Sequence, residues 1–167
     1  FSMLGFAECL NRELPKRDVR TTILAPTAQL GRLPAPGLVK KYLTYFDKYV
    51  SFPVRLKRAA KQHDLVHILD HGNAMYVRTI ADRPHLVTCH DLLAIRAAQG
   101  EIENWPIGPS GRTYQNLILA GLKRARWIAA VSNATRDDVL RLTGLSPERA
   151  PLVYNGIYQP LPQIEPE

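Results

Sequence analysis

The sequence predicts an α/β domain with a doubly wound parallel sheet, because short apolar runs alternate with helical patterns along the chain. Near-continuous apolar strands separated by helices are typical of a parallel sheet covered on both faces. With 167 residues and 46% hydrophobic content, the chain fits a single domain with a sizeable core. The predicted strands are residues 21–25, 65–69, 86–89, 127–131 and 152–154.

Helices are predicted between these strands. Residues 2–14 and 114–125 carry apolar side chains at helical spacing. Another helix follows Ser132, whose hydroxyl can accept a hydrogen bond from a backbone amide of the first turn. Residues 40–62 are interpreted as two helical pieces broken near Pro53, because proline has no amide proton and clashes with the preceding turn.

Both ends of the sequence look incomplete. The chain opens directly in an amphipathic helix, whereas a doubly wound fold normally begins with a central strand and a tight loop. Residues 158–167 have the proline-rich, polar composition of an interdomain linker. We therefore expect residues 1–157 to form one Rossmann-like domain without its first strand, and residues 158–167 to begin a linker to a missing second domain.

The net charge of +7 is concentrated in one segment. From Lys40 to Lys61 there are seven Lys or Arg residues and one acid, Asp47. The segment suits an anionic partner, either a membrane surface or a phosphorylated substrate. A nucleic acid is not expected, because no recognition motif accompanies the charge.

Neither a metal site nor a membrane span is predicted. Cys9 and Cys89 are not spaced as metal ligands, and both are interpreted as small core residues. No apolar run approaches the ~20 residues of a membrane-spanning helix. The first residues do not form a secretory signal, so the cytoplasm is the expected compartment.

Polar residues directly follow four of the predicted strands. Because ligands of open α/β sheets bind beyond the carboxyl ends of the strands, these residues are expected to meet at one rim. They are Asp70, His71 and Asn73, then His90 and Asp91, then Ser132 and Asn133, and finally Asn155 and Gly156.

Each of these residues also has a structural explanation. Asp70, Ser132 and Asn133 could cap the helices that follow, and the Asn-Gly pair at 155–156 could form a plain turn. An adjacent histidine and aspartate after a buried strand suit a proton donor, or a hydrogen-bond donor to an oxyanion or hydroxyl. A structural role for His90 stays open at this point. There is no GxGxxG, GxxxxGK[ST] or GxSxG motif.

Four blocks in order resemble one family closely. Residues 64–71 read Asp-Leu-Val-His-Ile-Leu-Asp-His, and residues 86–91 read Leu-Val-Thr-Cys-His-Asp. Residues 129–138 contain Ser-Asn-Ala-Thr-Arg, and residues 152–156 read Leu-Val-Tyr-Asn-Gly. Together they resemble the N-terminal half of the retaining glycosyltransferases of family 4, which have the GT-B fold.

The resemblance implies two facing Rossmann-like domains, the N-terminal one for the acceptor and the C-terminal one for a nucleotide-sugar donor, with no metal or other cofactor. It implies a catalytic contact from His90, which Asp91 would orient. The other implied residues are His71, Asn73, Ser132, Asn133 and Arg136 on the acceptor side, and Asn155 and Gly156 at the interdomain hinge. Family members of this kind also dock a basic, aromatic surface on anionic lipid, although a solvated charged face explains residues 40–61 equally well.

This chain departs from the family pattern in ways that matter for activity. We expect the family's first strand with its glycine-rich loop, and its whole donor domain, to lie outside this sequence, and Ile157 is followed by Tyr158 where the family has an acid. We expect the chain alone not to catalyse transfer, because it lacks groups to stabilise the departing phosphate. The alternative function is a non-catalytic domain that binds a glycan or a protein.

Overall fold

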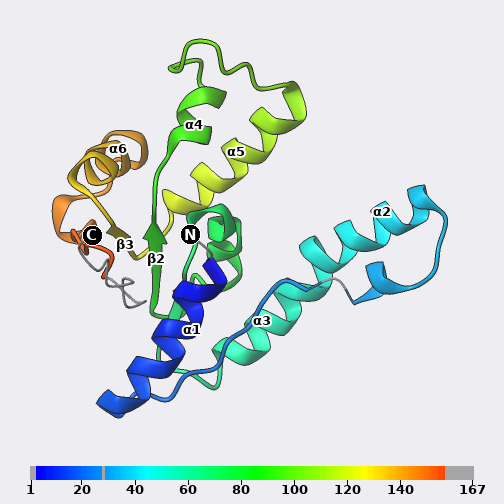
Figure 1. Ribbon diagram of the computed structural model, residues 1–167, viewed down its shortest axis with the longest axis horizontal. Helices are drawn as coiled ribbons and strands as arrows, with labels where there is room; N and C mark the ends of the chain where they lie inside the picture. Colours follow the sequence, from blue (N-terminus) through cyan, green and yellow to red (C-terminus); the bar gives the residue numbers. More distant parts are fainter. Residues whose placement is uncertain (1–2, 28, 157–167) are drawn as a thin grey trace, which may run out of the picture.

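The computed structural model describes residues 3–27 and 29–156 and contains a parallel three-stranded sheet (Figure 1). The strands β1 (Val66–Ile68), β2 (His85–Cys89) and β3 (Trp127–Ala130) lie in the order β1-β2-β3. Both pairings are parallel. The predicted α/β class with a parallel sheet is therefore confirmed, and the carboxyl ends of all three strands lie at the same edge.

The two remaining predicted strands have different outcomes. Residues 152–154 add only one parallel bridge, between Leu152 and Ala130, next to β3. The strand predicted at residues 21–25 is wrong: this segment belongs to no ladder. Its side chains instead bond to neighbouring helices and loops, since Thr21 donates to Asn11 and Thr22 contacts His63. An apolar run favours an extended backbone, but pairing also requires a neighbouring strand within about 5 Å.

The helices connect the strands and largely match the prediction. Ser132 Oγ accepts a hydrogen bond from Thr135 N at 3.1 Å, which confirms the predicted cap of α6. At the other end of α6, Gly144 adopts a φ of 71° that favours glycine. The helices outside the basic segment are α1 (Met3–Glu13), α4 (Leu93–Ala98), α5 (Pro109–Leu122) and α6 (Asn133–Thr143), with short turns η1 (Leu14–Arg17), η2 (Leu30–Arg32) and η5 (Pro147–Arg149).

The basic segment forms a helical arm that extends away from the sheet (Figure 1). It consists of α2 (Gly37–Phe46), a π-helical segment η3 (Asp47–Ser51) and α3 (Phe52–Ala60). The two predicted helical pieces are present, but the chain between them stays helical instead of breaking near Pro53. The helix widens before the proline, so that the Phe52 amide donates to the Asp47 carbonyl five residues back. Pro53 is the second residue of α3 and has no amide proton to donate into the preceding turn.

The hydrophobic core lies between the sheet, α5 and a run of 3₁₀ turns η4 (His71–Thr79). Val87 of β2, Ile128 of β3 and Leu122 of α5 are completely buried. At the closest approach, Gly121 of α5 faces the backbone of Ala74 in η4. Because Gly121 has no side chain, η4 can pack directly against α5, and this packing fixes the chain just after β1. The proposed linker at residues 158–167 lies outside the described residues.

Replacing Gly121 by alanine should destabilise the fold. The added Cβ would overlap the Ala74 carbonyl, which belongs to the backbone and cannot rotate away. We expect a loss of about 1–3 kcal/mol in the free energy of unfolding, measured by urea denaturation. Gly37→Ala is the matched control, because nothing lies within 4 Å of a Cβ at that position. Equal midpoints for the two variants would contradict this packing.

Candidate functional site

The predicted gathering of polar residues at the strand ends is observed for β1 and β2. His71 lies at the start of η4, and its Nδ1 is 3.5 Å from a carboxylate oxygen of Asp70. The charge of Asp91 raises the pKa of His71, and the charge of His90 lowers it. These residues lie just beyond two adjacent parallel strands. The topology therefore brings two imidazoles and two carboxylates to one rim.

His90 is held by backbone and aromatic contacts. Its Nε2 lies 3.1 Å from the Leu69 carbonyl, which can only accept, so Nε2 carries the proton. The ring of Phe6, from α1, meets the imidazole edge to face with the ring centres 5.8 Å apart. Together the Leu69 carbonyl and Phe6 restrict both the tautomer and the orientation of His90. Sequence reasoning missed both partners, because a backbone carbonyl and a helix contact carry no motif.

Asp91 has a structural contact of its own. One carboxylate oxygen accepts a hydrogen bond from the Leu93 amide at 3.1 Å, at the first residue of α4. This contact fixes the turn that leads from β2 into α4. The orientation of His90 by Asp91, expected from the sequence, stays a prediction.

His71 is the most perturbed group of the rim. Burial lowers the pKa of His71 because the imidazolium loses its hydration, and the carboxylates of Asp70 and Asp91 oppose this effect. Its Nδ1 is buried without a hydrogen-bond partner among the described residues. Asp70 caps η4 by accepting from Gly72 N at 2.8 Å, so the structural explanation holds for that residue. His71 Nδ1 is thus a buried polar atom that the Asp70 carboxylate approaches to 3.5 Å.

The residues after β3 hold the site together. Besides the cap from Ser132, the hydroxyl of Thr135 donates to the His90 carbonyl at 3.0 Å. This bond ties the first turn of α6 to the residue after β2. Thr135 belongs to the block that carries the family resemblance, but no local pattern predicts its contact with His90.

The other predicted residues after β3 are more peripheral. Arg136 Nε donates to the Ala150 carbonyl at 2.7 Å, so its guanidinium supports the chain after η5. Asn133 is the first residue of α6 rather than its cap, and its amide reaches the Tyr154 hydroxyl at 3.5 Å. Asn155 and Gly156 are exposed beyond the Leu152 bridge. The acceptor and hinge roles of these residues stay predictions.

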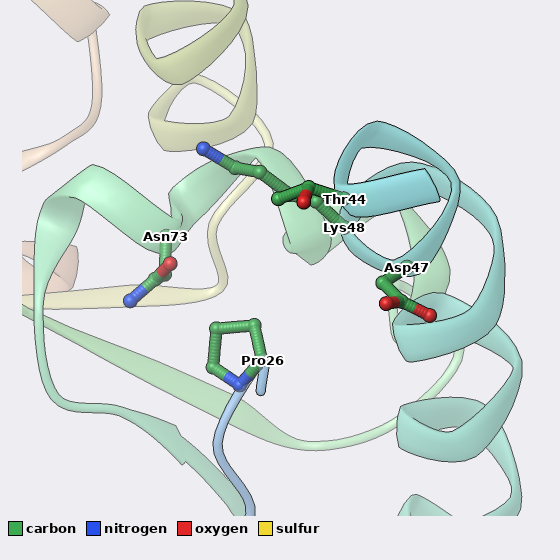
Figure 2. Close-up of a pocket in the computed structure, with 5 residues that line it drawn as sticks. All are labelled: Pro26, Thr44, Asp47, Lys48 and Asn73. Carbon is green, nitrogen blue, oxygen red and sulfur yellow. The ribbon is translucent and has the colours of Figure 1, made fainter. Parts of the chain in front are cut away.

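Asn73 leads from the rim into a pocket that the sequence did not reveal. The pocket has a volume of about 200 Å³ and is lined by Pro26, Thr44, Asp47, Lys48 and Asn73. Figure 2 shows Asn73 and Asp47 on opposite sides of this space, with Pro26 below them. The pocket therefore joins the segment after β1 to the π-helical part of the basic arm.

The remaining histidines and the cysteines have structural contacts. His67 bonds to Thr88 Oγ1 at 2.7 Å within the sheet, and burial lowers its pKa to about 4. This contact gives His67 a structural role within the sheet. Burial also raises the pKa of the Cys89 thiol. In the described ranges, no three His, Cys, Asp or Glu residues are grouped to hold a metal, and no helix is long and apolar enough to cross a membrane.

The fold and the residues at the strand ends together define a class of protein. A parallel α/β sheet with polar side chains at its strand ends is the architecture of a Rossmann-like domain, a fold in which ligands generally bind at the carboxyl ends of the strands. Comparison with protein families then gives a match to Glycosyltransferase Family 4 over residues 6–158. Because the match spans most of the chain, the protein belongs to this family. Searches among curated proteins and among solved structures gave no match.

The arrangement of the rim can be tested by titrating His71. Asp91 raises the pKa of this imidazole, so Asp91→Asn should lower it further below the ordinary value of about 6.5. The pKa is measured from the imidazole NMR shifts as a function of pH. Asp137→Asn, the same change at an exposed position of α6, should leave it unchanged. A pKa that rises in Asp91→Asn would show that Asp91 and His71 do not face each other.

Proposed function

We propose that this chain supplies the acceptor side of the cleft in a retaining glycosyltransferase, an enzyme that moves a sugar from a nucleotide-sugar donor to an acceptor hydroxyl. Family membership supports sugar transfer in general. The observation that carries the finer proposal is the fixed imidazole of His90, which is held by the Leu69 carbonyl at the carboxyl ends of the strands.

His90 is the residue proposed to contact the reacting groups. The imidazole ring is proposed to orient a hydroxyl near the transferred sugar. Fixing the ring before the substrate binds removes the entropic cost of ordering it during the reaction. His71 and Asn73, on the segment after β1, and Ser132, Asn133 and Arg136, after β3, are proposed to line the acceptor side.

The proposal assigns the donor to another domain. Stabilising a departing nucleoside diphosphate requires cations or amide donors aimed at the phosphates. We propose that a second Rossmann-like domain supplies them, that Asn155 and Gly156 serve as the hinge between the domains, and that this chain alone binds without transferring. No metal or other cofactor is assigned to the reaction.

His90→Ala in the complete enzyme should lower turnover strongly. Positioned acid-base groups contribute about 10²–10⁴ in rate, and we expect a loss in this range in a sugar-transfer assay. His63→Ala is the control, because His63 bonds to Thr22 and the Ala59 carbonyl away from the strand ends. If His90→Ala kept turnover within about twofold, the catalytic role would be refuted and a domain that only binds glycans would be favoured.

We also propose that the basic arm contacts an anionic membrane surface, which would place the protein at the cytoplasmic face of a membrane. In support, α2 exposes Leu38, Tyr42 and Phe46 beside Lys40 and Lys41. An apolar hollow of about 470 Å³ lies between α2 and η2. Aromatic and aliphatic side chains next to lysines are the combination that binds interfacially to anionic lipid.

Vesicle sedimentation tests the membrane contact. The chain should bind phosphatidylglycerol vesicles better than phosphatidylcholine vesicles, and added salt should weaken the binding. Charge reversal by Lys40→Glu with Lys41→Glu should reduce the binding about tenfold or more, since each lysine contributes about 1 kcal/mol near such a surface. The control is Lys123→Glu with Arg124→Glu, both exposed after α5. Equal loss in both double variants would contradict a contact specific to the arm.

A further inference from the structure

The pocket between the basic arm and the segment after β1 contains an unsatisfied acceptor. Asp47 is only 4% exposed, and its Oδ2 accepts from Gln29 N at 2.7 Å and from Gly31 N at 2.9 Å. Its Oδ1 is buried and receives no hydrogen bond from any residue in the described part of the chain. An unpaired buried carboxylate oxygen costs free energy, which a ligand that donates a hydrogen bond can recover.

The wall that carries Asp47 is held in place from several sides. Asp47 and Lys48 begin the π-helical segment, a distortion that is frequent at functional sites. Tyr76, from η4, donates its hydroxyl proton to the Lys48 carbonyl at 3.1 Å. Lys48 Nζ bonds to the Tyr114 hydroxyl at 3.1 Å, which connects the arm to α5. These contacts fix the carboxylate relative to the domain core.

The opposite wall offers a second free hydrogen-bonding group. The backbone amide of Asn73 donates to the Asp70 carbonyl, but its side-chain amide has no partner among the residues that the structure describes. Such an amide can donate and accept at the same time. Thr44 contributes little polarity, because its hydroxyl already donates to the Lys40 carbonyl. Pro26 supplies an apolar surface between the two groups, as Figure 2 shows.

We propose that this pocket binds a neutral polyhydroxylated group, such as a sugar ring, through Asp47 and Asn73. A carboxylate acceptor facing an amide across an apolar surface matches a ring that presents hydroxyls at its edge and C–H groups on its face. Lys48 also lines the pocket, but its Nζ bonds to the Tyr114 hydroxyl, whereas the Asp47 carboxylate would repel an anionic group. The volume of about 200 Å³ suits one such ring.

This inference rests on the proposed function, because it makes the pocket the place where the hydroxyl-rich part of the acceptor binds. Asn73 lies three residues after Asp70, so the pocket adjoins the rim that carries His71 and His90. The ligand would thus be bound by the arm and by the segment after β1 at the same time.

Ligand-observed NMR on the 167-residue chain tests the proposal. The probes are methyl glucoside, methyl mannoside and glucose 6-phosphate, each titrated to obtain an apparent Kd. We expect saturable binding of at least one methyl glycoside. Asp47→Asn replaces the unpaired acceptor while keeping the shape of the side chain, and it should weaken binding about tenfold or more. Asn73→Ala should weaken it in the same direction, and Asp137→Asn on α6 is the matched control.

Three results would overturn the proposal: no saturable binding of either methyl glycoside, binding that survives both Asp47→Asn and Asn73→Ala, or tighter binding of glucose 6-phosphate than of the neutral sugars. If Asp47→Asn loses its fold by circular dichroism, Asn73→Ala decides the matter. If the pocket does not bind sugar, the role proposed for His90 is unaffected, because transfer by the complete enzyme is measured independently. Sugar binding by this chain, combined with no transfer by the complete enzyme, would refute the proposed function and leave the pocket standing.

Discussion

The hydrogen bond from His90 Nε2 to the Leu69 carbonyl is the contact on which the candidate site depends. It joins the residue after β2 to the residue after β1. Because β1 and β2 are paired in parallel, this bond holds the His90 imidazole at a fixed position beyond the two strand ends. A carbonyl oxygen accepts only, which favours the tautomer with the proton on Nε2. Phe6 of α1 packs edge to face against the imidazole, which limits rotation of the His90 ring.

Other contacts transmit this constraint through the domain. Thr135 holds the His90 carbonyl from the first turn of α6, and the same turn is capped by Ser132. On the other side, the close approach of Gly121 and Ala74 positions η4 and with it His71 and Asn73. The Ser-x-x-Thr block therefore has a physical meaning here: its hydroxyls bind backbone groups and set the distance between the ends of β2 and β3.

The sequence predicted the parts of the fold that depend on local chemistry. Apolar runs located β1, β2 and β3, and the hydroxyl of Ser132 located the start of α6. Residues 21–25 were mispredicted, because a run of aliphatic residues favours an extended backbone but does not provide a pairing partner. The site shows the same limit. His90 followed from its position after a strand, whereas the unpaired oxygen of Asp47 depends on tertiary contacts from Gln29 and Gly31, which no local pattern reveals.

The central claim is that the backbone at the end of β1 fixes the His90 imidazole. A long-range proton–nitrogen NMR correlation of the neutral ring measures directly which nitrogen carries the proton. The structure predicts the Nε2–H form, with Nδ1 unprotonated. Observation of the Nδ1–H form would contradict the account, because an unprotonated Nε2 cannot donate to the Leu69 carbonyl.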